Sequence, residues 1–428
     1  MNYIEKRKQL ETLLKSGKTA KLIFPVWSSQ KAHEYGNRLS FIYYRMDDEA
    51  GIINCNHIDG CKIDMPQTIT AITDSETFVY GIRYLQDMLP NGVDFEWAWL
   101  ENYGTPFSFE EQFSALYNGY RSDYKTLHDC IPIMKWFEKL EKLPDMPQSP
   151  DSYKKYTQGI ITLGSIEKNA IQVDFERFTK EYDFPADYIY KNRVYTKYNP
   201  YTTTGRPTNR HLNVNWSAIP KVGGKRQTVI SRYEPMNGTL IQFDWESYHL
   251  RLIGRMVGYE FPENISAHSH LSEWYGDIDY ESAKALTFRY LYGGLDDVGK
   301  SIPFFQSVNT YISELYRKFI IDGKLTTPIF GREIGFQRIS EPSEQKVFNY
   351  LLQSIETEIN YKKLNEILKV MHGKMSKLIL YTYDAILIDT HPSERDSVIS
   401  EIQKVMIRGG FPVRTYEGKN YGNLVFLF

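Results

Sequence analysis

The longest pattern in the chain is a stripe of apolar residues over residues 344–371, with the three-to-four spacing of an α-helix. The stripe consists of Val347, Phe348, Leu351, Leu352, Ile355 and Ile359. Ser343 stands where a helix N-cap is expected, and Gly373 stands just past the predicted end. We therefore predict a long helix there, and similar patterns predict shorter helices over residues 245–257 and 282–291.

Short apolar runs in the same half of the chain predict strands. Residues 239–243 (TLIQF) form one such run and end at Asp244. Residues 378–382 and 385–388 form two more, joined at Tyr383-Asp384, which is a hairpin signal. An aspartate therefore lies at the end of a predicted strand at two widely separated places.

The first part of the chain mixes both kinds of pattern. Residues 21–27 and 39–44 predict strands, whereas residues 76–88 and 130–143 predict helices. This mixture indicates a small α/β domain.

A proline-rich segment at residues 143–152 (LPDMPQSPDS) is the best candidate for a domain boundary, because proline fixes φ and removes a backbone donor. We predict one domain at residues 1–145 and another at residues 146–428. A length of 428 residues is consistent with two or more domains.

Composition narrows the class of protein. Hydrophobic residues make up 42% and charged residues 24%, which excludes a disordered chain, a coiled-coil rod and a disulfide scaffold. No apolar stretch approaches the roughly 20 residues that span a bilayer, so no membrane association is expected. Cys55, Cys61 and Cys130 are too few for a disulfide framework. We interpret them as reduced thiols of a cytoplasmic protein.

Charge and aromatic content leave the partner open. The net charge is −2, which indicates no polyanionic partner by itself, although a total hides separate acidic and basic clefts. Aromatic residues reach 15%, with 33 tyrosines. Two interpretations of these aromatic residues are open: they fill the core and surface, or they offer ring surfaces on which nucleobases stack.

The strand-end aspartates Asp244 and Asp384 allow two interpretations. A single aspartate at a strand end is usually a turn or cap residue. Two of them on neighbouring strands would instead hold Mg²⁺ ions, because hard cations prefer carboxylate oxygens in rigid positions.

Lys284, Phe288 and Tyr292 are spaced by four residues and form one stripe of the predicted helix. This stripe allows two interpretations. In the first, the rings pack into a core while the lysine reaches solvent. In the second, the lysine binds a triphosphate while the rings face a base and sugar.

Six segments, in this order along the chain, resemble motifs of the family A DNA polymerases, and bacteriophage members are the nearest in character. They are residues 204–210 (TGRPTNR), 244–251 (DWESYHLR), 284–293 (KALTFRYLYG), 345–353 (QKVFNYLLQ), 381–386 (YTYDAI) and 418–422 (GKNYG). Six pieces in the right order are far more specific than any one of them.

This resemblance implies an α+β right-hand polymerase that adds dNTPs to a primer 3′ end on template DNA. The implied palm covers about 150–251 and 346–428, and the fingers about 252–345. The domain at residues 1–145 takes the place of the family's exonuclease. The resemblance also implies two Mg²⁺ ions as cofactors, for which Mn²⁺ is expected to substitute, and host cytoplasm as the location if the protein is viral.

Site roles follow from the same resemblance. Asp244 and Asp384 are implied metal ligands and catalytic residues, and Lys284 is implied to neutralise the triphosphate. His268 is implied to make another phosphate contact. The remaining nucleotide-binding and DNA-binding candidates are Phe288 at the sugar and base, Tyr292 at the templating position, His249, Arg206, Arg210, Asn349 and Gln353. Arg206 and Gln353 are implied to read minor-groove acceptors, which correct base pairs present alike.

The chain departs from the family pattern at four positions. Tyr280 replaces a phosphate-binding arginine, and His249 replaces the residue, typically glutamate, that excludes ribose. Tyr383 and Ala385 replace a histidine and a second acid beside Asp384. We expect activity to persist, because both principal acids and the motif lysine remain.

The family's long helical thumb has little room here. Residues 170–177 resemble the entry to the thumb, and the primer-contact segment begins near Thr202. Loss of the thumb removes phosphate contacts, so we expect a weak hold on duplex DNA. We therefore expect low processivity for the chain alone, or a clamp or helicase-primase partner that replaces the thumb.

Two Asp-x-Glu strings in the first domain, Asp74-Ser-Glu76 and Asp94-Phe-Glu96, are formal matches to the start of an exonuclease metal site. Such strings arise often by chance, and little chain follows for the other metal ligands. We predict a degenerate exonuclease-like domain without proofreading activity.

Two alternative functions remain. A single-subunit RNA polymerase shares the three catalytic motifs, although Phe288 and the bulky His249 favour deoxynucleotides. A non-catalytic subunit that binds primer-template DNA would not need Asp384.

Overall fold

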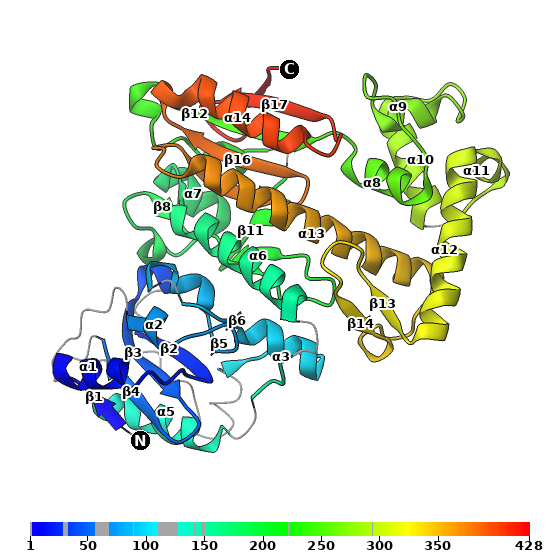
Figure 1. The fold of residues 1–428 in the computed structure, drawn as a ribbon. Coiled ribbons are helices and arrows are strands. Elements are labelled where there is room, and N and C mark those ends of the chain that lie inside the picture. Colours follow the sequence, from blue (N-terminus) through cyan, green and yellow to red (C-terminus); the bar gives the residue numbers. More distant parts are fainter. Residues whose placement is uncertain are drawn as a thin grey trace. The chain divides into compact units, whose positions relative to one another are not determined.

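The computed structural model divides the chain into two compact units, which are coloured along the sequence in Figure 1. The structure describes residues 2–28, 33–55, 68–88, 90–109, 127–140, 143–146, 150–220, 223–292 and 294–428. The first unit comprises Met1–Ala170, Tyr182–Tyr201 and Asn209–Val214, and the second comprises Ile171–Glu181, Thr202–Thr208 and Asn215–Phe428. The first unit thus continues beyond residue 145, where the sequence predicted a boundary.

The first unit is built on a six-stranded mixed sheet with the order β1-β4-β3-β2-β5-β6. Its strands are β1 (Asn2–Ile4), β2 (Leu22–Ser28), β3 (Arg38–Arg45), β4 (Ala50–Asn54), β5 (Phe78–Val79) and β6 (Val93–Asp94). Its helices are α1 (Arg7–Lys15), α2 (Thr68–Ala71), α3 (Phe95–Tyr103), α5 (Leu127–Lys139) and α6 (Pro150–Asn169). The predicted strands and the helix before the linker are confirmed.

Both faces of this sheet are covered. Along β2, Phe24 packs with Trp136 and Phe137 of α5 in one core cluster. The next side chain, Ile23, points to the opposite face, where it packs with Leu10 of α1. Successive side chains of a strand alternate between faces, so burial on both sides explains the nearly continuous apolar runs in the sequence.

The helix predicted over residues 76–88 is wrong. Phe78-Val79 forms β5, which lies between the parallel strands β2 and β6, and short 3₁₀ turns follow. Gly81 has φ of +56°, a left-handed conformation that interrupts a right-handed helix. Pairing with strands from elsewhere in the chain overrode the local helical spacing.

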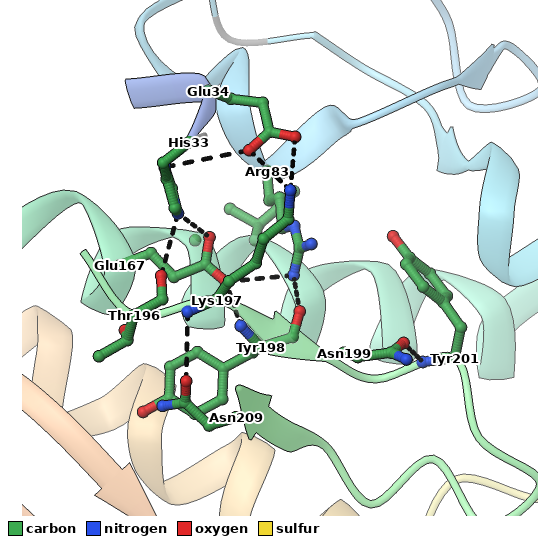
Figure 2. A network of polar contacts seen from close by, with 12 residues as sticks. His33, Glu34, Arg83, Glu167, Thr196, Lys197, Tyr198, Asn199, Tyr201 and Asn209 are labelled. Carbon is green, nitrogen blue, oxygen red and sulfur yellow. Dashed lines mark hydrogen bonds and ion pairs between the residues drawn. The ribbon is translucent and has the colours of Figure 1, made fainter. Parts of the chain in front are cut away.

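A buried polar network joins α6 to the first unit (Figure 2). Glu167 of α6 accepts a hydrogen bond from the Tyr198 N–H at 2.6 Å, and Arg83 donates to the Tyr198 carbonyl at 2.6 Å. The two side chains also form an ion pair at 3.3 Å, and both are buried. Burial alone would lower the pKa of Arg83, but the charge of Glu167 keeps it raised. These contacts explain why α6 belongs to this unit.

Short elements occupy the chain between α6 and the second sheet. They are β7 (Ile171–Gln172), α7 (Phe175–Tyr182), β8 (Arg193–Val194), β9 (Tyr198–Asn199), β10 (Thr208–His211) and β11 (Val214–Asn215). In this stretch α7 is the longest helix, with 8 residues.

The second unit contains an antiparallel sheet with the order β15-β16-β12-β17-β18. Its strands are β12 (Thr239–Trp245), β15 (Lys377–Thr382), β16 (Ala385–Thr390), β17 (Val413–Gly418) and β18 (Val425–Phe426). The predicted strands at residues 239–243, 378–382 and 385–388 are confirmed, and so is the hairpin at Tyr383-Asp384.

Helix α13 (Glu344–Met371) is the long helix that the apolar stripe predicted, and both of its ends agree with the prediction. The Ser343 side chain caps it by accepting a hydrogen bond from the Lys346 N–H. Helix α13 lies beside α14 (Arg395–Ile407), and both helices contact the sheet (Figure 1).

A helical part of the second unit lies between β12 and α13 in the sequence. Its helices are α8 (Tyr248–Val257), α9 (Ala267–Ser272), α10 (Tyr280–Tyr292), α11 (Asp297–Ser301) and α12 (Pro303–Asp322). A small ribbon of β13 (Lys324–Thr326) and β14 (Glu333–Gly335) follows. The predicted helix over residues 245–257 begins later, at Tyr248, because Trp245 still pairs with β17.

The structure also bears on membrane-spanning segments and on the cysteines. No helix in the described ranges is both long enough and apolar enough to cross a membrane. Cys55 is a free thiol, whereas Cys61 and the side chain of Cys130 lie outside the part that the structure describes.

Candidate active site

Strand pairing brings Asp244 and Asp384 to the same end of the second sheet. In the β12–β16 ladder Asp244 is directly opposite Ala385, the residue after Asp384. The Trp245 N–H also donates to the Asp384 carbonyl at 2.9 Å. Burial raises the pKa of Tyr421, and the charge of Arg226 lowers it. The negative charges of Asp244 and Asp384 both raise this pKa further. Both carboxylates therefore lie close enough to influence the same tyrosine hydroxyl.

The turn that carries Asp384 is held by α13. Tyr383 has φ of +64°, so this turn needs support from its surroundings. The buried amide of Asn360 donates to the Tyr383 carbonyl at 2.9 Å and to the Tyr381 hydroxyl at 2.7 Å. The same side chain accepts a hydrogen bond from the Tyr248 hydroxyl of α8 at 3.0 Å. Sequence analysis missed Asn360, whose only signal was a polar residue within a long apolar helix.

These aspartates line a cavity of about 370 Å³, which is large enough for a small-molecule ligand. Its lining includes Arg206, Asp244, Glu246, His249, His268, Tyr280, Lys284, Phe288, Glu356, Tyr383, Asp384 and Arg414. Asp244, Glu246 and Asp384 form an acidic wall of the cavity, and Lys284, His268 and Arg414 form a basic wall. The two walls adjoin, because Arg414 lies opposite Asp244 in the β12–β17 ladder and 3.8 Å from Glu246.

The acidic wall suits a hard divalent cation only in part. Among the described residues, no three His, Cys, Asp or Glu side chains gather as a metal-holding group. Glu246 is near Asp244, but it pairs with Arg251 at 2.8 Å and accepts a hydrogen bond from Ser247. Burial would raise the pKa of Glu246, yet these partners lower it. Asp244 and Asp384 thus fit Mg²⁺ as carboxylate ligands if a substrate's phosphate oxygens and water complete the coordination.

The basic wall consists of Lys284 on α10, His268 on α9 and Arg414 on β17. Burial, together with the charges of Lys284 and Arg414, lowers the pKa of His268 to about 4. Its imidazole is therefore neutral near pH 7 and acts as a hydrogen-bonding group there. Arg414 pairs in register with Asp244 and was missed by the sequence analysis. Tyr280, which replaces an expected arginine, also lines the cavity.

The aromatic stripe of α10 lies partly at the cavity. Phe288 is 38% exposed and lines the cavity, with its ring 5.6 Å from the ring of His268. A fully packed core position would be buried, so part of this ring faces the cavity. Tyr292 ends α10, and its side chain lies outside the part that the structure describes.

Arg206 reaches the cavity from a loop that is bound to α13. Gly205 has φ of +72°, and its carbonyl accepts a hydrogen bond from the Tyr361 hydroxyl at 3.3 Å. The Thr204 hydroxyl donates to Gln353 Oε1 at 3.3 Å. Helix α13 therefore holds this loop and places Arg206 near the acidic wall.

The other DNA-binding candidates lie elsewhere. Arg210 is exposed on β10 in the first unit. Asn349 and Gln353 are half-buried on α13, one helical turn apart. None of these three belongs to the described lining of the cavity, so the structure brings Arg206 alone of the four to it.

The two Asp-x-Glu strings of the first unit have local structural roles. Asp74 accepts hydrogen bonds from the Glu76 N–H and the Thr77 hydroxyl in a turn. Asp94 is buried and caps α3 by accepting from the Trp97 N–H at 2.7 Å. Each aspartate is thus used by the backbone around it.

Asp94 and Glu96 nevertheless share one partner. The Tyr201 hydroxyl lies 3.3 Å from Asp94 Oδ2 and 2.9 Å from Glu96 Oε2. One hydroxyl proton can serve only one carboxylate at a time. Burial, followed by the charge of Asp94, raises the pKa of Glu96 to about 8. Burial also raises the pKa of Asp94.

This pair predicts a pH-dependent stability. Because the folded state binds the proton of Glu96 more tightly than the unfolded state does, its contribution is complete below pH 4.5 and is lost as the pH rises through about 8. We expect the free energy of unfolding, measured with urea at pH 6 and pH 9, to be lower at pH 9. Glu96→Gln should reduce this difference. An unchanged difference in the variant would contradict the assignment.

Comparison with known proteins gives a structural relative. No family model and no curated protein matches the chain. The chain is similar to the solved POL domain of Pol1 from M. smegmatis, in complex with DNA primer-template and dNTP. The TM-score is 0.68 at 12% sequence identity, covering 98% of this chain and 99% of that chain. The predicted α+β fold is therefore confirmed as that of a polymerase domain.

Proposed function

We propose that the protein is a template-directed DNA polymerase that adds dNTPs to a primer 3′ end. The main support is the meeting of Asp244, Asp384 and Lys284 at one cavity, in a chain with a polymerase-like fold. A turn or cap role for these aspartates would not require cationic side chains in the same cavity.

Each wall of the cavity has a part in the proposed reaction. Lys284 and Arg414 would bind the triphosphate, so that Arg414 supplies the cation missing at Tyr280. Phe288 would contact the sugar and base of the incoming nucleotide. The primer 3′-hydroxyl would lose its proton to water as its oxygen forms a bond to the α-phosphorus. The bond between the α-phosphorus and the oxygen that bridges to the β-phosphate would break, and pyrophosphate would leave.

Asp244 and Asp384 would hold two Mg²⁺ ions, with Mn²⁺ as a substitute. Bound there, the ions would supply charge stabilisation for the attacking and leaving oxygens. The protein contributes mainly position, because β12, β16 and α13 fix the two carboxylates before substrate binds.

The proposal also assigns the palm, the fingers and the first domain of the enzyme. The palm would be residues 150–251 and 346–428 and the fingers 252–345, with closure of α10 over the nucleotide. We propose a bacteriophage-type enzyme with a reduced thumb, low processivity and no proofreading, in which residues 1–145 serve as scaffold. Primer-template DNA is the main partner, and a clamp or helicase-primase would extend the hold on duplex.

Primer extension by the purified chain tests the proposal. On a primed template in Mg²⁺ we expect stepwise addition of each templated dNTP, with short products when a DNA trap limits synthesis to one binding event. Synthesis from rNTPs on an unprimed promoter duplex would favour the RNA polymerase alternative. DNA binding without any extension, in Mg²⁺ or Mn²⁺, would favour the non-catalytic subunit. Long products under the trap would contradict low processivity.

A further inference from the structure

A buried glutamate, Glu356 of α13, lies at the wall of the cavity. Its side chain is 1% exposed. Glu356 Oε2 lies 2.7 Å from Nε of Arg206, and Glu356 Oε1 lies 3.2 Å from Nε2 of His249. A second guanidinium nitrogen of Arg206 is 3.4 Å from Oε1. One carboxylate thus engages two cavity-lining side chains that come from distant segments.

The surroundings keep this carboxylate charged. Burial alone would raise the pKa of Glu356, but its hydrogen bond and charge interactions with His249 and Arg206 outweigh burial and lower it. A buried carboxylate without such partners is strongly unfavourable, so all three side chains hold each other in place.

Arg206 and His249 are both positioned to meet a ligand. The side chain of each is 25% exposed and lines the cavity. Arg206 is fixed at a second point, because its guanidinium lies 3.6 Å above the ring of Tyr383. His249 stands at the first turn of α8, and its Nε2 lies 3.2 Å from Glu356 Oε1. A ring fixed in this way presents a rigid wall, whereas a released ring can rotate away.

We propose that Glu356 is a positioning residue for sugar selection, which holds the His249 ring against the 2′ position of the incoming nucleotide while it anchors Arg206. This inference rests on the proposed polymerase function. A single carboxylate would then couple the residue that checks the sugar to a residue that contacts the primer terminus. Glu356 itself need not touch the substrate.

The two contacts of Glu356 predict two separable effects. Release of His249 should admit ribose, which lowers the ratio of kcat/KM for dNTP over rNTP. Release of Arg206 should slow both nucleotides alike and leave that ratio unchanged. A purely structural role for Glu356 would lower stability without changing the ratio.

The test compares Glu356→Gln, His249→Ala and the double variant in single-nucleotide primer extension with a dNTP and its matching rNTP. We expect Glu356→Gln to lower the dNTP/rNTP ratio by at least about tenfold, because the change removes the buried charge that lies 3.2 Å from the His249 ring. We expect His249→Ala to lower the ratio similarly. The double variant should resemble His249→Ala in this ratio, because both changes remove the same contact.

Glu358→Gln is the matched control. Glu358 is also buried on α13, but its carboxylate accepts hydrogen bonds from the Thr327 hydroxyl at 2.6 Å and the Phe330 N–H at 3.0 Å. We expect this change to lower thermal stability and to leave the dNTP/rNTP ratio within twofold of the original. If Glu356→Gln does not fold, Glu356→Asp keeps the charge and lengthens the contact with His249, so the ratio should still fall.

The outcomes separate this inference from the proposed function. If the unaltered protein extends no primer, the polymerase proposal fails first. If it extends primers but Glu356→Gln keeps the original ratio, the positioning role of Glu356 is wrong while the polymerase proposal stands. Multiplying effects in the double variant would also overturn the inference, since they would place Glu356 and His249 in independent roles.

Discussion

Replacing Asp384 with asparagine is expected to reduce primer extension by at least about a thousandfold, since the change removes one of two carboxylates that the proposal assigns to metal binding. The backbone of the turn should survive, because Asn360 holds the Tyr383 carbonyl and the Trp245 N–H binds the Asp384 carbonyl, and neither contact uses the carboxylate. Asp244→Asn should have a similar effect. The measurement is single-turnover extension of a labelled primer.

Binding of primer-template DNA should persist in the Asp384→Asn variant, because the change removes no cation. Asp389→Asn is the matched control: Asp389 lies on β16, the strand that follows Asp384, and is buried, but it is bound by Ser231 and Arg232. We expect that control to lose stability and to keep its rate per folded molecule. If Asp384→Asn extends primers within tenfold of the original rate, Asp384 is not a metal ligand of the reaction.

Replacing Lys284 with alanine is expected to raise KM for the dNTP by about a hundredfold, the upper range for loss of a hydrogen bond between charged groups. Lys284 lines the same cavity as the aspartates, and its charge helps to lower the pKa of its neighbour His268. Lys284→Arg keeps the charge and should recover part of the affinity. Steady-state extension at varied dNTP concentration measures the effect.

Lys300→Ala is the control for this second experiment. Lys300 is a largely exposed lysine of α11, also in the helical part of the second unit, whose charged neighbour is Asp297. We expect its removal to leave KM for the dNTP unchanged. If Lys284→Ala instead weakens DNA binding while KM for the dNTP stays constant, the lysine contacts DNA and the basic wall needs another assignment.

Local patterns in the sequence determined the elements that carry the candidate site. The apolar stripe and its cap residues define α13, because burial of one helix face and capping are properties of neighbouring residues. The runs that end at Asp244 and surround Asp384 likewise define β12 and the β15–β16 hairpin. The order of six motif-like segments was enough to predict the fold.

Tertiary structure alone decided which residues surround those aspartates. Glu356 and Asn360 read in the sequence only as polar positions of a long helix, yet one engages His249 and Arg206 and the other holds the Tyr383 turn. Arg414 joins the basic wall because β17 pairs with β12. Periodicity shows which face of an element is buried, but contacts between segments far apart in the chain depend on how those faces pack together. The wrong helix prediction at residues 76–88 has the same cause. Phe78-Val79 forms a strand by pairing with β2 and β6, which local periodicity does not show.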